Sequence, residues 1–367
     1  MFLGPSSHSL CQPLLRLQAR TISQRSCGIV GYPNIGKSTL FNALTQTQQA
    51  QASNYPFCTI EPNVAKVAVY DRAVKNLVKV AQPQKVTPAQ IEIWDIAGLV
   101  KGSNEGAGMG NRFLQNIRSV HAIVHLVRCF DDLNVIYSEG DVNNLDPITE
   151  MEDVQTELIL SDLEICAKKN MKKGLTPREI GVWNKVYKQL DNGEPVRTLE
   201  FNIDEAPIVA ELPLISAKPL LFACNVGTEG FVDGSPLADK FIAYAKEKYP
   251  GTPTVVLSSL LEHEIVQIKQ SDGQEAAEEY MELSGLEESV LDNLLEECSN
   301  ILGLQKFYTA GETHVSSWFI KRGATAPQAA GAIHTAFEKA FICAEVTKVQ
   351  DWLDIGDEDA LRRKNKW

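Results

Sequence analysis

The sequence predicts an α/β fold, and three observations lead to that prediction. The apolar run Gly28-Ile-Val30 turns through a glycine-containing loop into a helical pattern that includes Leu40, Phe41 and Leu44. Strand patterns rich in β-branched residues recur later in the chain, at 64–69, 91–95, 122–128, 220–225 and 254–258. Stretches with helical spacing of apolar residues lie between some of them. The main domain is therefore expected to span residues 26–302.

The loop after the first strand has the spacing G-x-x-x-x-G-K-S/T. Gly31 and Gly36 hold the two glycine positions, and Lys37 and Ser38 follow them. Glycines in such a loop let successive backbone N–H groups surround a phosphate at the start of a helix. Lys37 is then the charge on the β- and γ-phosphates, and Ser38 is a Mg²⁺ ligand through its hydroxyl. Because strand, loop and helix occur in the required order, the sequence predicts a P-loop rather than a chance glycine-rich turn.

A second motif, D-x-x-G, follows the strand pattern at 91–95. Asp95 is expected to hold Mg²⁺ through water, and Gly98 to offer its N–H to the γ-phosphate. Upstream, the polar loop 54–63 contains Thr59, the well-placed threonine for completing the Mg²⁺ shell when a γ-phosphate is present. An ordinary surface loop is an equally good interpretation of that segment. The D-x-x-G motif together with the P-loop predicts hydrolysis of a nucleoside triphosphate.

The residue after Gly98 is Leu99, where signalling GTPases of the Ras type place a glutamine that orients the attacking water. Hydrolysis is therefore expected to be slow and to depend on another polar group, a cation or a partner. The glycine-rich run 101–110 that follows is interpreted as a second switch.

His121 and His125 stand four residues apart in a strand pattern. At about 3.3 Å per residue they would lie about 13 Å apart, which is too far to share a zinc ion. A histidine in the protein core is the simpler interpretation of each.

Composition limits the classes of function. The chain has 367 residues with 44% hydrophobic and 22% charged residues, and no apolar run reaches the length of a membrane span, so no membrane partner is expected. The net charge of −12 argues against a general polyanion binder, although a local basic face could still contact RNA. Sequence-specific DNA binding is not expected. The eight cysteines include no C-x-x-C pair, so neither a zinc site nor a disulfide framework is suggested.

The N-terminal stretch, residues 1–25, differs from the rest of the chain. No Asp or Glu precedes Glu61, and Arg16, Arg20 and Arg25 are interleaved with Leu, Ser and Gln. This pattern is typical of a transit peptide, which would direct the protein to a mitochondrion or a plastid. A disordered tail on a cytoplasmic protein is the alternative.

Two further regions are expected. Residues 146–218 interrupt the main domain, and their apolar residues recur at helical spacing before and after a break at 174–177, which predicts an antiparallel helical hairpin. This hairpin could contact a partner or serve as a lid or spacer. Residues 303–367 form a third region, with strand patterns at 307–311, 315–320 and 344–349 and a helical pattern at 326–337.

Four segments together resemble one family closely: 27–45, 55–63, 95–102 and 125–130. They are similar to YchF, the Obg-like ATPase family. The resemblance implies an OBG-type G domain with a helical insertion, followed by a C-terminal TGS domain of the β-grasp type. It also implies hydrolysis of ATP in preference to GTP and association with ribosomes. The family continues beyond the position of Trp367 with two closing strands, so the TGS-like region 303–367 is interpreted as incomplete.

The resemblance also implies roles for individual residues. It assigns phosphate and base contacts to the P-loop, at Asn34, Ile35, Gly36, Lys37, Ser38 and Thr39. It assigns Mg²⁺ to Ser38 and Thr59, and it makes His125 a candidate catalytic residue beside Lys37. Asn34 matches an asparagine that helps to coordinate K⁺ in potassium-stimulated relatives, so K⁺ is a possible activator.

Base recognition is where the sequence departs from the family. The strand at 220–225 ends in Asn225, the base-reading position, and Val226 and Ser258 belong to the two loops expected to contact the base. The guanine-reading form N-K-x-D is absent. The family has N-x-x-E, but Thr228 occupies the acidic position and Glu229 comes one residue late. Because the acid of the guanine-reading motif is absent, ATP is predicted to bind more tightly than GTP.

The sequence thus predicts a Mg²⁺-dependent, ATP-hydrolysing P-loop protein that acts as a ribosome-associated regulator. Two alternatives remain. One is a GTPase of ribosome assembly, and the other is a scaffold whose bound nucleotide has little catalytic role.

Overall fold

The structure, a computed structural model, describes residues 25–52, 63–70, 72–96, 109–131, 146–170, 174–286, 288–311, 313–356 and 358–364. They form two compact units. The first comprises residues 25–66 and 92–302, and the second comprises residues 67–91 and 303–367. The two units are described separately below.

A six-stranded sheet, most of which lies in the first unit, has the order β2-β4-β1-β5-β6-β7. Its strands are β1 (Ser26–Val30), β2 (Val64–Ala68), β4 (Gln90–Asp95), β5 (Ala122–Arg128), β6 (Leu220–Asn225) and β7 (Thr254–Leu257). β1 pairs in parallel with β4 and β5, and β6 pairs in parallel with β5 and β7. Every residue of β1, β5 and β6 is buried. Strands of this apolar kind are typical of a parallel sheet that helices cover on both faces.

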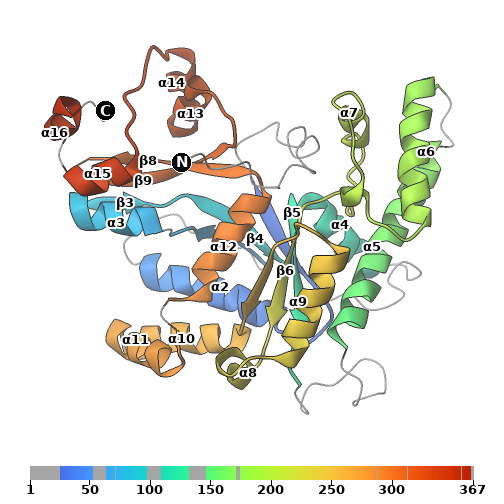
Figure 1. Cartoon of the computed structure of the whole chain (residues 1–367), viewed down its shortest axis with the longest axis horizontal. Coiled ribbons are helices and arrows are strands. Elements are labelled where there is room, and N and C mark those ends of the chain that lie inside the picture. The colour runs from blue at the N-terminus through green and yellow to red at the C-terminus, as the bar shows by residue number, and fades with distance from the viewer. Residues whose placement is uncertain are drawn as a thin grey trace. The chain divides into compact units, whose positions relative to one another are not determined.

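Two groups of helices provide that cover (Figure 1). On one face, α4 (Met109–Ser119), α5 (Pro147–Asn170) and α9 (Pro236–Lys248) share a hydrophobic core with β5 and β6. Ile117, Val154, Phe241 and Phe222 are among its fully buried members. On the other side, α2 (Lys37–Ala52) packs against α10 (Ser259–Ser271), and α12 (Val290–Ile301) contacts β5, β6 and β7. Two further helices are α8 (Thr228–Val232) and α11 (Gln274–Leu283).

The segment between β5 and β6 builds a second core. α5 and α6 (Pro177–Asp191) pack together, and Thr176 and Glu179 form a capping box that fixes the start of α6. α5 contributes Leu158 to the sheet core and Cys166 to the second core around Trp183. The 3₁₀ helix η1 (Val196–Thr198) and α7 (Ala206–Val209) are the regular elements described between α6 and β6.

The second unit contains a three-stranded sheet in the order β3-β9-β8. β3 (Lys85–Thr87) pairs in parallel with β9 (His314–Lys321), and β8 (Leu304–Ala310) pairs with β9 in antiparallel fashion. Its helices are α3 (Arg72–Ala81), α13 (Ala326–Ile333), α14 (Thr335–Lys339), α15 (Val349–Ile355) and α16 (Glu358–Arg363). Residues 67–91, which the sequence assigned to the 26–302 domain, belong to this unit. They belong to it because β3 pairs with β9. The sequence did not predict this, because no local pattern indicates so distant a strand partner.

The strand predicted at 344–349 is not formed. Residues 341–348 have no regular structure, and α15 begins at Val349. Val346 is 74% exposed and Ala344 is also exposed, so the alternation at this position does not correspond to a buried face.

Several predicted features lie outside the described residues and stay predictions. They are the N-terminal stretch up to residue 24, Thr59, Gly98, Leu99 and most of the glycine-rich run 101–110. Within the described part of the chain, no helix combines the length and the apolar character needed to cross a membrane.

Gly31 provides a test of this architecture. Its φ of +154° is unfavourable for other residues, and an added Cβ would lie 2.5 Å from the carbonyl oxygen of Leu126 on β5. We expect Gly31→Ala to lower the free energy of unfolding by about 2 kcal/mol, measured by urea denaturation.

The matched control is Gly181→Ala on the exposed face of α6, where nothing lies within 4 Å. That change should stabilise the protein by up to about 1 kcal/mol, because alanine is the better helix former. Equal stability of the two variants would contradict the packing described for β1 and β5.

Candidate nucleotide-binding site

The loop between β1 and α2 has the backbone that a P-loop requires. Gly36 has a φ of +94°, and an added Cβ there would lie 2.6 Å from Nδ2 of Asn225. Asn34 adopts a φ of +60°, a conformation that asparagine tolerates better than most residues. Ile35 is buried and anchors the loop in the core, and the N–H of Leu40 donates to the carbonyl of Gly36 at 2.9 Å. These contacts place Lys37 and Ser38 in the first turn of α2, beside the end of β1.

Lys37 is buried, and its ammonium donates to the backbone carbonyl of Tyr32. Burial lowers the pKa of Lys37 to about 8, although the nearby carboxylate of Asp95 acts in the opposite direction. The hydroxyl of Tyr32 in turn donates to Asp153 on α5 at 2.9 Å. The P-loop is therefore held both by its own Lys37 and, through the hydroxyl of Tyr32, by α5.

Ser38 and Asp95 meet at the phosphate end of the site. The Ser38 hydroxyl donates to Oδ2 of Asp95 at 2.7 Å. Oδ1 of Asp95 is buried, and no donor reaches it within the described residues. A hydroxyl and a carboxylate with a spare oxygen form the kind of hard oxygen set that Mg²⁺ prefers. These two residues therefore fit the predicted metal, while the third predicted ligand, Thr59, lies outside the described residues.

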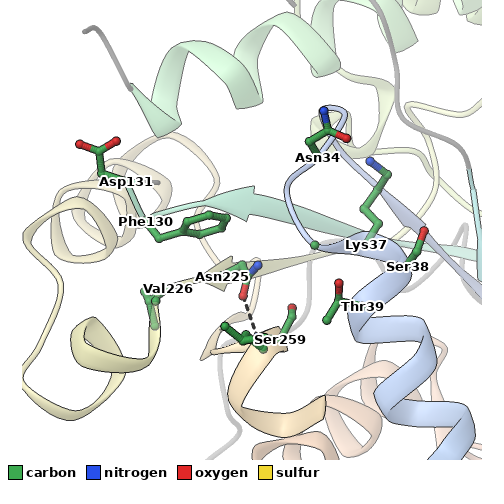
Figure 2. Close-up of a pocket in the computed structure, with 12 residues that line it drawn as sticks. Asn34, Lys37, Ser38, Thr39, Phe130, Asp131, Asn225, Val226 and Ser259 are labelled. Atoms are coloured by element: carbon green, nitrogen blue, oxygen red, sulfur yellow. Dashed lines mark hydrogen bonds between the residues drawn. The ribbon is translucent and has the colours of Figure 1, made fainter. Parts of the chain in front are cut away.

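The side chain of Asn225 ties three elements together. Its Nδ2 donates to the carbonyl of Ile35 at 2.8 Å. Its Oδ1 accepts from the N–H of Ser259 at 2.8 Å (Figure 2). Asn225 ends β6 and is 4% exposed. The predicted base-reading residue thus also joins the P-loop to the start of α10.

A cavity of about 550 Å³ opens between these elements (Figure 2). It is lined by P-loop residues Asn34, Gly36, Lys37, Ser38 and Thr39, by Asn225, Val226 and Gly227 after β6, by Ser259 and Leu260 of α10, and by Phe130 and Asp131. A cavity of this size suits a nucleotide, with the phosphates at the P-loop and an aromatic ring at the far end. Sequence reasoning missed Phe130, Asp131, Gly227, Ser259 and Leu260. The available signal was that Phe130 and Asp131 follow the C-terminal end of a buried strand, where ligands of α/β sheets bind.

Some predicted base-contacting residues have other partners. Ser258 does not line the cavity; it is buried and caps α10, accepting from the N–H of Leu261. Val226 lines the cavity, but its N–H donates to the carbonyl of Leu257. Neither Thr228 nor Glu229 is among the lining residues. Both lie in the short helix α8.

His125 lies on β5 and is 1% exposed. Its Nδ1 lies 3.1 Å from Nε2 of Gln155 on α5, and its ring centroid is 5.9 Å from that of Phe222. Burial, with the positive charges of Arg197 and Lys37, lowers the pKa of His125 to about 3. This value lies well below the ordinary histidine pKa of 6.5, because the ring is enclosed in the core. At neutral pH the imidazole carries no charge.

The sheet and this site define the class of the protein: an α/β protein with the P-loop GTPase fold. Two family models match the chain. Residues 26–169 match the model described as a 50S ribosome-binding GTPase. Residues 304–367 match the C-terminal model of YchF GTPases, described as a protein of unknown function (DUF933).

Individual relatives narrow the class to one family. The chain is 39% identical over 348 residues to the ribosome-binding ATPase YchF of Escherichia coli O157:H7, covering 93% of each chain. It is 36% identical over 355 residues to Obg-like ATPase 1 of Schizosaccharomyces pombe, covering 93% of this chain and 88% of that protein. A solved structure of the Schizosaccharomyces pombe YchF GTPase superimposes with a TM-score of 0.82 at 35% identity, covering 95% and 94% of the two chains. The chain belongs to the YchF family.

The pKa of Lys37 gives a prediction for nucleotide binding. A bound triphosphate raises the pKa of the ammonium, so the complex holds a proton that the free protein loses above about pH 8. Affinity should therefore be highest below pH 8 and fall above it, by at most about tenfold per pH unit. Calorimetry of triphosphate binding at pH 7 to 9.5, in buffers of different ionisation enthalpy, measures both the affinity and the proton uptake. Lys37→Arg should bind without this pH dependence, because arginine stays protonated throughout. A flat profile for the wild-type protein would contradict the assignment.

Proposed function

We propose that this protein is a Mg²⁺-dependent P-loop ATPase. The observation that carries the proposal is the cavity that has Lys37 and Ser38 at one end and Phe130 at the other, with Asn225 between them (Figure 2). Such a cavity accommodates a triphosphate and a base at the same time. The E. coli relative bears the name of an ATPase, which supports the same reaction.

Each residue of the phosphate end has a separate task in this proposal. The Lys37 ammonium leaves the carbonyl of Tyr32 and contacts the β- and γ-phosphates, where positive charge stabilises the transition state. Ser38 and Asp95 would hold Mg²⁺, which would supply positive charge beside the phosphate oxygens. Thr59 and the N–H of Gly98 complete the set when a γ-phosphate is present.

ATP is the proposed substrate because the cavity lacks the acid of the guanine-reading motif. Thr228 stands at that position and does not line the cavity. One observation favours GTP as a second candidate: the carboxylate-bearing residue Asp131 does line the cavity. A carboxylate there could accept hydrogen bonds from guanine N1–H and N2 or from the adenine amino group.

Competition between nucleotides separates the two substrates. We expect ATP to bind at least several-fold more tightly than GTP, measured by calorimetry in the presence of Mg²⁺. Asp131→Asn tests the second candidate: it should change the ratio of the two affinities only if the carboxylate contacts the base. Lys37→Ala is the negative control and should weaken both nucleotides. GTP binding tenfold more tightly than ATP would overturn the proposed specificity.

Hydrolysis must proceed without a glutamine at position 99, and His125 and K⁺ are the proposed replacements. His125 is buried and is not among the residues that line the cavity, so this role requires its Nε2 to reach the site when nucleotide is bound. The neutral imidazole would then donate a hydrogen bond to the attacking water or a phosphate oxygen, but it cannot supply positive charge at neutral pH. K⁺ held near Asn34 would supply that charge against the β- and γ-oxygens. Asn34 lines the cavity beside Lys37, in agreement with this position.

Steady-state hydrolysis of ATP and GTP in K⁺ and in Na⁺ tests this mechanism. Ser38→Ala should abolish turnover, and His125→Ala should lower kcat with little change in nucleotide affinity. Asn34→Ala should remove the K⁺ dependence and leave a slow basal rate. Identical wild-type rates in the two salts would exclude the cation, and a normal rate for His125→Ala would reduce the histidine to a core residue.

We further propose that the protein acts on ribosomes, because the E. coli and Bacillus subtilis relatives are named ribosome-binding ATPases. The α5–α6 segment is then a helical insertion in the G domain, and the second unit includes the TGS-like region. Adding ribosomal subunits to the same hydrolysis assay tests the partner directly, since a regulator of this kind should show a changed rate or cosediment with them.

A further inference from the structure

A buried chain of hydrogen bonds leads from η1, in the segment between β5 and β6, through α5 to His125. Nη1 of Arg197 donates to Oε1 of Gln155 at 2.9 Å, and Nε2 of Gln155 lies 3.1 Å from Nδ1 of His125. The three side chains are each at most 8% exposed and come from η1, α5 and β5. The chain therefore connects the segment between β5 and β6 with the strand that borders β1.

The chemistry of these groups fixes the direction of each hydrogen bond. A guanidinium has donors and no acceptor, so the side-chain oxygen of Gln155 must face Arg197. The NH₂ group of Gln155 then faces His125 and can only donate. Nδ1 of His125 must accept that hydrogen bond, and in a neutral ring the proton resides on Nε2. The structure thus determines the tautomer without a hydrogen position being observed.

Arg197 is itself held in place by backbone. The backbone N–H of Arg197 donates to the carbonyl of Ser216 at 3.0 Å, and its side-chain Nε donates to the carbonyl of Lys218 at 3.0 Å. Ser216 and Lys218 are buried and precede β6 by a few residues. The guanidinium therefore has a fixed position relative to the sheet, and Gln155 has one arrangement that satisfies both of its neighbours.

We propose that Gln155 and Arg197 are positioning residues that hold His125 as its Nε2–H tautomer for nucleotide hydrolysis. The α5–α6 segment is then a working part of the hydrolytic site instead of a lid or spacer. This inference rests on the proposed function, because it requires His125 to take part in the reaction. It extends that function by assigning His125 the role of hydrogen-bond donor through Nε2 and not that of a base.

The electrostatics of the site agree with this role. Burial, and after it the charges of Arg197 and Lys37, disfavour protonation of His125, so the ring stays neutral while the hydrogen bond from Gln155 orders its proton. A base with an ordinary pKa would make kcat fall as the pH drops through 6.5. If His125 is instead a neutral hydrogen-bond donor, its titration does not lower kcat near pH 6.5.

Two substitutions at position 155 separate positioning from packing. Gln155→Glu keeps an acceptor for Arg197 and replaces the donor that faces His125 with a second acceptor, so the proton should move to Nδ1. Gln155→Leu removes both hydrogen bonds at similar size. The matched control is Gln189→Leu on α6, which removes a 2.9 Å hydrogen bond from Gln189 to Thr198, next to Arg197. All variants are made in the full chain.

The first readout is the tautomer. Nitrogen NMR of ¹⁵N-histidine-labelled protein, with His125→Ala used to assign the signal among six histidines, should show the Nε2–H form in the wild type. Gln155→Glu should show a proton on Nδ1, and Gln189→Leu should be unchanged. A wild-type ring that is protonated on Nδ1, or charged at neutral pH, would overturn the proposal.

The second readout is hydrolysis. Gln155→Glu and Gln155→Leu should each lower kcat about tenfold or more while nucleotide affinity stays constant. The double variant His125→Ala with Gln155→Leu should be no slower than His125→Ala alone, because Gln155 acts through the histidine. Normal kcat in both Gln155 variants beside a slow His125→Ala would refute the positioning role and leave the proposed function intact. A normal rate for His125→Ala itself would instead refute the catalytic assignment, and this proposal with it.

Discussion

The buried amide of Asn225 is the interaction on which the geometry of the site depends. One side chain satisfies the carbonyl of Ile35 in the P-loop and the N–H of Ser259 at the start of α10. Removing it would leave two buried backbone groups without partners, each at a cost of about 1–3 kcal/mol. The close approach of Gly36 to the same amide shows how little space separates the loop from β6. The P-loop and the start of α10 are consequently both held to the end of β6 by one side chain.

α5 extends this assembly beyond the sheet. Its first half carries three polar contacts to the nucleotide side of the molecule: Glu150 to Arg128, Asp153 to Tyr32, and Gln155 to His125. Leu158 packs in the sheet core, and residues near the other end of α5 pack around Trp183. A single helix therefore belongs to two cores. The hydrogen bond from Tyr32 to Asp153 therefore links the P-loop to a helix that also packs in the second core.

The P-loop and Asp95 could be read from the sequence because their spacing is local. Lys37 and Ser38 occur within one turn of a glycine pair, and Asp95 ends a strand whose apolar pattern is clear. Phe130 and Leu260 could not be assigned in the same way, since they meet only when β5 and α10 come together. Ser258 illustrates a different limit: serine is both a good base contact and a good N-cap, and the start of α10 decides between them. The pKa of His125 depends on complete burial, which a strand pattern suggests but does not measure.

The pairing of β3 with β9 has a consequence for how the polypeptide acquires its structure during synthesis. Lys85 and Thr87 pair only with His314 and Ser316, more than 220 residues later in the sequence. At translation rates of about 5–20 residues per second, β3 would wait on the order of ten seconds or more for β9 to be made. Throughout that interval the hydrogen-bonding edge of β3 is available to water, chaperones or other nascent chains. In the first unit β1, β5 and β6 are synthesised well before β9, so their pairing can precede that of β3 with β9, whereas the first unit as a whole is complete only at Leu302.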